Sequence, residues 1–370
     1  MTRWTASDLP DLTGRTALIT GAGRGLGLIT ARELARAGAR VVLGVRDAGK
    51  TRGAVAGLPG TFDVRTLDVS DLSSVRAFAG SWSGRLDILI NNAGVMDIPA
   101  RRTADGLDVQ TATNYTGPFL LTNLLLEHVT ARVVHVTSQL HRQGKIDLAD
   151  LDWRTRRYNG MGAYGASKLA VVLFSLELQR RLTATGSPVR SVLASPGIAR
   201  TALASHSRAN VINRFAFLTN DPERGALSVL YAAVQDVPGN AYVGPDGLGG
   251  LRGYPAVRRQ GKAGLDEAMA RRLWEATADL VNTEARRRDA APGTGPHKTE
   301  SPGAAGPGGA CRPERNAAAG PRFRLPSKDD RNWHDHSMTD ANCTTGKRYS
   351  LSFPVNVLSS ADQGAGTAAP

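Results

Sequence analysis

Short apolar runs alternate along most of the chain with longer stretches in which apolar residues recur at helical spacing. Each run is rich in Val, Ile and Leu and ends near a glycine, asparagine or serine, which is typical of a strand buried on both faces. The strands predicted in this way lie at residues 16–20, 41–45, 62–67, 86–90, 133–137 and 189–193. The predicted helices lie at residues 25–37, 71–79, 105–128, 164–182 and 265–281, with a less regular helix and loop at 49–60.

Residues at the ends of these segments support the helix predictions. Gly38 follows the first helix as a C-cap, and Ser70 precedes the second as an N-cap. Gly117 and Pro118 should bend the long helix at 105–128, because proline interrupts helical hydrogen bonding. Strands that alternate with helices at this spacing predict an α/β fold, with a parallel sheet covered by helices on both faces.

The pattern changes after about residue 283. Segments such as 291–296 and 301–310 are rich in Pro, Gly and Ala and have almost no apolar periodicity. We therefore predict a single domain over residues 1–283 and a largely disordered, low-complexity tail over 284–370. The tail either binds a partner or has no selected role. We favour the second interpretation, because its one apolar island, at 351–357, is too small to fold alone.

Composition excludes several classes of protein. The net charge of +13 is mostly arginine and is scattered along the chain, so we expect no nucleic-acid partner. Both cysteines, Cys311 and Cys343, lie in the predicted tail, which leaves the domain without disulfides or thiolate ligands, and we expect no metal. We find no signal peptide and no apolar run long enough to span a membrane, so we expect a cytoplasmic protein without a membrane partner.

A glycine-rich turn lies between the first predicted strand and the first predicted helix. Glycines there allow a tight turn and a close approach to a pyrophosphate, which the helix N-terminus stabilises. A glycine pattern alone is weak, but its place at the first strand–helix junction of an α/β chain strengthens it. The predicted dinucleotide-binding residues of this turn are Gly21, Gly23, Arg24, Gly25, Leu26 and Gly27.

The choice between NADP(H) and NAD(H) depends on residues at the end of the second strand. Asp47 lies where an acidic residue would bind a ribose 2′-hydroxyl and reject a 2′-phosphate. However, Val45 occupies the strand end, and Arg46 and Arg24 bring two guanidiniums that bind phosphate well. Arg46 alternatively only solvates the strand end. We favour NADP(H) over NAD(H).

Two further strand ends should contact the dinucleotide, because ligands bind beyond the carboxyl ends of strands in such sheets. Asp68 and Val69 follow the third strand and are placed to contact the adenine. The string at residues 91–94 follows the fourth strand and should line the cofactor through Asn91, Asn92, Ala93 and Gly94.

Tyr164 and Lys168 form the strongest chemical signal in the chain. Residues four apart share one helix face, so the phenol and the ammonium can meet one substrate. The ammonium favours tyrosinate and should lower the pKa of the phenol. Ser138, at the end of the fifth strand, can stabilise charge on a substrate oxygen, and Asn114 can hold water against Lys168 through its side chain or a freed carbonyl.

Each of these residues has a structural alternative when taken singly. Ser138 could be a helix cap, Asn114 a helix irregularity, Tyr164 a core aromatic and Lys168 a solvated side chain. All four residues follow a nucleotide-binding turn in the chain, and it is improbable that all four structural alternatives hold at once. We therefore predict that Asn114, Ser138, Tyr164 and Lys168 are the catalytic residues.

Across about residues 12–283, the chain resembles the short-chain dehydrogenase/reductase family. The resemblance implies a Rossmann-type fold and a hydride transfer between a nicotinamide and a carbonyl or secondary alcohol, with Tyr164 as general acid/base and Lys168 holding the nicotinamide ribose. Ser138 would orient the substrate oxygen and Asn114 would anchor a proton-relay water. It further implies that Pro196, Gly197 and Ile198 border the nicotinamide, with Thr201 near its carboxamide or the phosphates. A homodimer or homotetramer is expected by the same resemblance.

The long stretch between Ser138 and Tyr164 is similar to that of the retinol-dehydrogenase-like and protochlorophyllide-reductase-like branch. The membrane anchor of the animal retinol enzymes is not expected here, and a domain without cysteine disfavours the protochlorophyllide interpretation.

The substrate pocket should involve residues 138–152 and an apolar lid at 198–220. The lid favours a moderately large apolar substrate, although its side chains could equally serve packing. Two rival functions remain: a non-catalytic nucleotide-binding or interaction protein, and a nucleic-acid-binding protein.

Overall fold

The computed structural model describes residues 3–197 and 220–290. The predicted tail from residue 291 onward and almost all of the predicted lid, 198–219, lie outside the described residues. The domain boundary expected at residue 283 falls within the last helix, which continues to Ala290.

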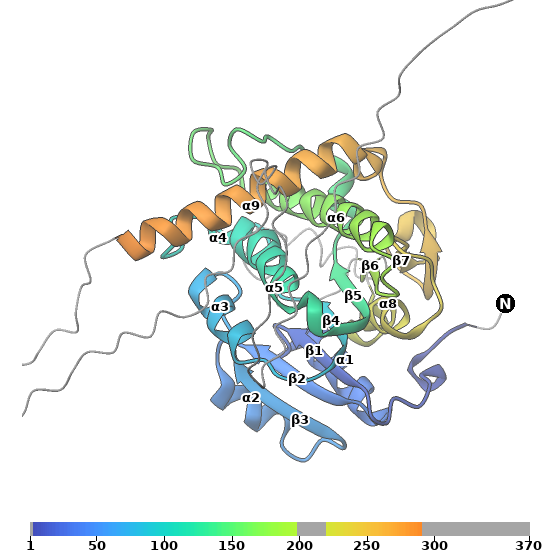
Figure 1. The fold of residues 1–370 in the computed structure, drawn as a ribbon. Coiled ribbons are helices and arrows are strands. Elements are labelled where there is room, and N and C mark those ends of the chain that lie inside the picture. Colours follow the sequence, from blue (N-terminus) through green and yellow to red (C-terminus); the bar gives the residue numbers. More distant parts are fainter. Residues whose placement is uncertain (1–2, 198–219, 291–370) are drawn as a thin grey trace, which may run out of the picture. The chain divides into compact units, whose positions relative to one another are not determined.

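An eight-stranded sheet in the order β3-β2-β1-β4-β5-β6-β7-β8 organises the described chain (Figure 1). Neighbouring strands are parallel except β7 and β8, which pair antiparallel at one edge. The strands are β1 (Thr16–Thr20), β2 (Arg40–Val45), β3 (Thr61–Thr66), β4 (Leu86–Asn91), β5 (Val129–Val136), β6 (Arg190–Ala194), β7 (Tyr242–Pro245) and β8 (Pro255–Arg258). The strand order reverses between β1 and β4, which is where this Rossmann-type topology binds dinucleotides.

Helices cover both faces of the sheet. The α-helices are α1 (Gly25–Arg36), α2 (Ala48–Val55), α3 (Leu72–Gly80), α4 (Val109–Thr111), α5 (Gly117–Leu125), α6 (Gly160–Ala184), α8 (Pro222–Val234) and α9 (Glu267–Ala290). One π-helical segment, η2 (Ala112–Thr116), joins α4 to α5. The short 3₁₀ segments are η1 (Ala6–Asp8), η3 (Leu126–His128), η4 (Gln139–Gln143), η7 (Leu248–Gly250) and η8 (Lys262–Leu265). Helices α1 and α8 pack together on one face, and α6 packs with α9 on the other (Figure 1).

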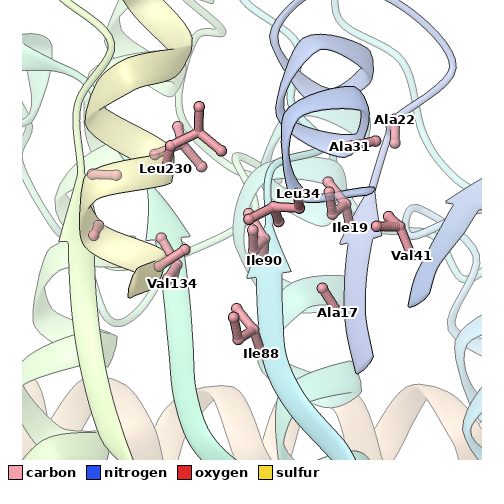
Figure 2. Close-up of a cluster of buried hydrophobic side chains, with 14 of the residues drawn as sticks. Ala17, Ile19, Ala22, Ala31, Leu34, Val41, Ile88, Ile90, Val134 and Leu230 are labelled. Atoms are coloured by element: carbon pink, nitrogen blue, oxygen red, sulfur yellow. The ribbon is translucent and has the colours of Figure 1, made fainter. Parts of the chain in front are cut away.

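The core beneath α1 and α8 is built from small and branched aliphatic side chains (Figure 2). Ile19 of β1 and Ile90 of β4 lie under Leu34 of α1, while Val134 of β5 lies under Leu230 of α8. All five side chains are almost fully buried. Burying one such side chain stabilises the fold by about 1.5–3 kcal/mol, so this layer fixes the strands whose ends carry the functional residues.

The structure differs from the sequence prediction between β4 and β5. The helix expected at 105–128 begins only at Val109, where the Asp108 carboxylate accepts a hydrogen bond from the Thr111 amide at 2.8 Å. The irregularity expected at Gly117 is instead the π-helical turn η2, just before it. Such turns insert one extra residue into a helix and often occur at functional sites.

Helix α3 also begins differently from the prediction. Asp71, and not Ser70, is the N-cap, and its carboxylate accepts hydrogen bonds from the Ser73 and Ser74 amides. The hydroxyl of Ser70 instead donates to Asp68 at 2.6 Å. Acid and hydroxyl side chains both cap helices well, so their order along the chain does not decide which one does.

Helix α6 is long and apolar enough to cross a membrane by composition alone, but 83% of its most apolar window is buried inside the domain. Its apolar residues are explained by packing between the sheet and α9.

Candidate active site

The glycine-rich turn connects β1 to the N-terminus of α1. Gly21 and Gly25 have φ of +66° and +58°, a region that side chains disfavour. A Cβ on Gly25 would meet nothing within 4 Å, so open space lies in front of this backbone. Arg24 occupies the N-cap position of α1, but its side chain accepts no hydrogen bond from the helix backbone. The helix N-terminus is therefore available to an anion, and the turn fits a dinucleotide pyrophosphate.

The end of β4 is fastened to this turn by Thr20. Its hydroxyl accepts hydrogen bonds from the Asn92 and Ala93 amides, both at 3.0 Å. The Asn92 side chain donates to the Thr20 carbonyl at 2.8 Å. Gly21 packs so closely on Ala93 that a Cβ would lie 2.9 Å from its Cα. The two predicted cofactor-binding segments therefore form one rigid surface.

Asn91 does not line this surface, contrary to the prediction. Its side chain is buried and donates to the Thr122 hydroxyl at 2.8 Å, with the His135 ring 3.3 Å away. Burial lowers the pKa of His135 to about 3, so this ring is neutral. Because successive strand residues point to opposite faces, Asn91 faces the α5 side of the sheet and leaves the cofactor role to the residues after it.

Two arginines and two aspartates lie at the predicted adenosine end. Arg24 and Arg46 are both exposed. The Asp47 carboxylate caps α2 by accepting a hydrogen bond from the Lys50 amide at 2.9 Å. Asp68 accepts bonds from the Ser70 amide and hydroxyl in the loop after β3. This engagement of Asp47 weakens its candidacy as the ligand of a ribose hydroxyl.

Tyr164 and Lys168 lie one turn apart on α6, and each is only 4% exposed. The Lys168 Nζ is 5.7 Å from the centre of the Tyr164 ring and donates to the Val136 carbonyl at 3.0 Å. A Cβ on Gly94 would lie 3.5 Å from this Nζ. The lysine therefore connects the end of β4, the end of β5 and the tyrosine.

Burial dominates the proton affinities of this pair. It raises the pKa of Tyr164 to about 12, against a smaller downward effect of a hydrogen bond with Ser138. Burial also lowers the pKa of Lys168 to about 8. The pKa of Tyr164 is therefore raised and not lowered as predicted, because loss of hydration on burial disfavours the phenolate. At neutral pH the phenol is a proton donor.

Asn114 lies inside the π-helical turn, and its side chain is fully engaged. Its Oδ1 accepts from the Val95 amide at 2.8 Å, and its Nδ2 donates to the Val95 carbonyl and to the Ser167 hydroxyl, both at 2.9 Å. Ser167 in turn donates to the Tyr164 carbonyl at 2.8 Å. The Asn114 side chain is occupied by these bonds to Val95 and Ser167. Its backbone carbonyl therefore remains the candidate for holding water.

Ser138 follows β5 and is the N-cap of η4, with its Oγ accepting from the Leu140 amide at 3.3 Å. It is partly exposed, and its hydroxyl lowers the pKa of the Tyr164 phenol against the larger effect of burial. The capping alternative and the catalytic role are thus both compatible with this position, because a hydroxyl can accept one bond and donate another.

His141 belongs to the site, although the sequence patterns do not single it out. Its ring is fully buried, and Nδ1 lies 2.7 Å from the Ser138 carbonyl while Nε2 accepts from the Gly261 amide at 3.0 Å. This pattern requires the neutral ring with the proton on Nδ1, and burial lowers the pKa of His141 in agreement. The only sequence signal is its spacing three residues after Ser138, which a short 3₁₀ turn brings together.

The remaining predicted residues lie beyond β6. Gly197 has φ of +72°, and Pro196 accepts a hydrogen bond on its carbonyl from the Asn220 side chain at 3.2 Å. Ile198 and Thr201 lie outside the described residues. Within the described ranges, no group of three His, Cys, Asp or Glu side chains is placed to hold a metal ion.

Comparisons with known proteins agree with this geometry. Residues 15–211 match the model of the short chain dehydrogenase family. Retinol dehydrogenase 13 of Homo sapiens is 40% identical over 296 residues, which cover 74% of this chain and 86% of that protein. Polyprenol dehydrogenase of Mus musculus is 38% identical over 288 residues, covering 72% and 83%.

A crystal structure of an uncharacterised protein from Mycobacterium Paratuberculosis is 47% identical to this chain, with a TM-score of 0.68. It matches over 76% of this chain and 98% of its own length. These relatives agree with the glycine-rich turn after β1 and with the tyrosine–lysine pair on α6. The chain belongs to the short-chain dehydrogenase family, in the branch of the retinol dehydrogenases.

Proposed function

We propose that this oxidoreductase uses NADP(H) to interconvert a carbonyl and a secondary alcohol, with Tyr164 as the general acid/base. The observation that carries the proposal is the placement of Tyr164 and Lys168, buried on one face of α6, beside Gly94 and Ser138 at the carboxyl edge of the sheet. Within one turn of helix, this arrangement offers a proton donor and a fixed positive charge beside the expected nicotinamide site.

The bound nicotinamide supplies the hydride, and the residues of the chain manage the developing charge. Ser138 donates a hydrogen bond to the substrate oxygen, and Tyr164 gives it a proton. The Lys168 ammonium then stabilises the tyrosinate that remains. The raised pKa of Tyr164 suits the reducing direction, since the phenol carries its proton at neutral pH.

The preference for NADP(H) is proposed to come from Arg46, with Arg24 beside it. We expect Arg46→Ala to lower kcat/KM for NADPH by about 10–100-fold, because a charge-assisted bond to the 2′-phosphate is worth about 1.5–3 kcal/mol. Turnover with NADH should change little. Arg52→Ala, an exposed arginine of α2, is the matched control. An unchanged ratio of NADPH to NADH activity in Arg46→Ala would contradict this assignment.

The pH profile of reduction should report Lys168. Its pKa of about 8 means that the ammonium is complete below neutral pH and is lost as the pH rises through 8. We expect kcat/KM for carbonyl reduction to be level at pH 6–7 and to fall about tenfold per unit well above pH 8. In an active Lys168→Arg variant, the fall should move to higher pH, because guanidinium stays charged. A wild-type profile that stays level to pH 10 would refute the role of the lysine.

The proposed substrate is a moderately large compound with an apolar body. The names of two relatives refer to retinol and polyprenol, both long apolar primary alcohols, so we include an aldehyde and its primary alcohol among the proposed substrates. The predicted lid that would contact such a body lies outside the described residues, so this part of the proposal rests on its sequence and on the relatives.

A direct assay tests the function. Purified full-length protein with NADPH is offered a panel of apolar aldehydes and ketones, and NADPH oxidation is followed by absorbance. We expect turnover of at least one class. Tight NADPH binding without turnover across the panel would favour the non-catalytic nucleotide-binding protein. Salt-sensitive retention on DNA without turnover would favour the nucleic-acid-binding protein.

A further inference from the structure

A recess lies at the end of the sheet formed by β7 and β8, and Gln139, the residue after Ser138, lines it. It has a volume of about 700 Å³ and is lined by residues of η4, η7 and the β8 edge. We call it the arginine recess, and its lining residues are Gln139, Arg142, Gln143, Gly249, Val257, Arg258 and Arg259. Three of the seven residues are cationic and none is acidic.

Two of the three guanidiniums of this recess, those of Arg142 and Arg258, are held in place by hydrogen bonds without being neutralised. Arg142 donates from Nε to the Gln139 side-chain oxygen at 3.1 Å and from Nη2 to the Arg259 carbonyl at 2.6 Å. Arg258 donates from Nη1 to the Asp246 carbonyl at 3.2 Å. These acceptors are uncharged. Among the described residues, none of the three arginines forms an ion pair with a carboxylate, so their positive charge remains available to a ligand.

Many arginines elsewhere in the described chain form ion pairs with carboxylates, although others, such as Arg24 and Arg46, do not. Arg180 and Arg181 both pair with Glu177, each at 2.8 Å. Arg40 pairs with Asp63 at 2.7 Å. Against this pattern, three unpaired guanidiniums around one concavity are an arrangement suited to an anion. Arg142 and Arg258 also act together on the buried phenol of Tyr242, where both oppose the burial that raises its pKa.

The arginine recess is continuous with the catalytic site along the chain. Gln139 directly follows Ser138, and its side chain donates to the Gly250 carbonyl at 3.5 Å. The dinucleotide turn lies after β1, whereas the recess lies at β7 and β8, on the far side of β5 in the sheet order. An anion in the recess is therefore distinct from the 2′-phosphate of a cofactor bound at that turn.

We propose that the arginine recess binds an anionic group, a carboxylate or phosphate, carried by the substrate at a distance from its reacting carbonyl. The inference rests on the proposed function and narrows the substrate to an apolar carbonyl compound with an anionic end. Val257, which is 51% exposed at the recess, offers contact to the apolar part. Arginine suits this role because its fork binds both carboxylate and phosphate bidentately.

The test compares a medium-chain oxo-fatty acid with its methyl ester at saturating NADPH. We expect wild-type kcat/KM to favour the acid by about tenfold or more, the value of one charge-assisted interaction. Combining Arg142→Gln, Arg258→Gln and Arg259→Gln should abolish the preference, by lowering kcat/KM for the acid to that of the ester. Arg40→Gln, which removes a charge from the opposite half of the sheet, should keep the preference.

Several outcomes decide the matter. Equal kcat/KM for acid and ester in the wild type overturns the arginine recess proposal, as does a preference that survives the triple substitution. A carbonyl substrate with a terminal phosphate, run beside the acid, shows which anion is preferred. If neither acid nor ester is turned over, the proposed function fails. The recess is then judged by calorimetric binding of the oxo-acid, where equal affinity for the wild type and the triple variant overturns it.

Discussion

Replacing Tyr164 with Phe is expected to lower kcat for carbonyl reduction by about 10²–10⁴-fold, the usual contribution of a positioned proton donor. The substitution removes one hydroxyl and keeps the buried ring in place, so α6 and the surface around Gly94 should be preserved. NADPH should therefore bind with nearly unchanged affinity. Steady-state kinetics and fluorescence titration of NADPH measure the two effects separately.

Ser138→Ala is the matched variant for this result, because it removes the other hydroxyl at the same substrate oxygen. It should also reduce kcat, because the substrate oxygen loses a hydrogen-bond donor. The pH dependence of kcat/KM, which Lys168 sets, should stay unchanged. A Tyr164→Phe enzyme that keeps wild-type kcat would show that another group delivers the proton, and the assigned mechanism would be wrong.

Replacing Gly117 with Ala is expected to give the largest loss of stability among small substitutions. A Cβ at this position would overlap the Val69 carbonyl oxygen and contact the Ala112 carbonyl at 3.1 Å. Both neighbours are backbone, so the π-helical turn or the loop after β3 must move. Overpacking of this kind costs about 3 kcal/mol, which corresponds to a fall of roughly 6–12 °C in the melting temperature.

Gly53→Ala provides the control for the Gly117 prediction. Gly53 lies in α2, a Cβ added there would meet nothing within 4 Å, and its φ is not positive. Alanine there should stabilise the protein by about 0.5–1 kcal/mol, because it favours the helix. Calorimetry of both variants checks the pair. A Gly117→Ala protein that melts with the wild type would mean that the close contact with Val69 is absent in solution.

The sequence was sufficient to predict the parallel sheet and the tyrosine–lysine pair. Most of the strands from β1 to β6 appear as apolar runs because the sheet is covered by helices on both faces, whereas β3 alternates apolar and charged residues. Residues four apart necessarily share a helix face. It did not predict β7, β8 or α8. Strand β8 is short, antiparallel and begins at Pro255, features of an edge strand that leave little periodicity to detect.

Contacts between distant segments were also beyond sequence patterns. His141 reaches Gly261, and Asn114 reaches Val95, through loops whose course no local periodicity specifies. The pKa of Tyr164 was predicted to fall, whereas burial raises it, because residue spacing shows the neighbouring ammonium but not the loss of hydration. The spacing of reactive side chains on one helix can thus be read from the sequence, whereas the burial that changes their pKa values depends on the packed fold.

The central claim is that the chain transfers a hydride from NADPH to a carbonyl carbon with Tyr164 supplying the proton. NADPH carrying deuterium at the transferring position, mixed with a ketone that the protein turns over, tests it by mass spectrometry of the alcohol. We predict that the deuterium appears on the carbinol carbon with the wild type and is essentially absent with Tyr164→Phe. NADPH oxidation that leaves the alcohol unlabelled, or equal labelling by both proteins, would contradict the account.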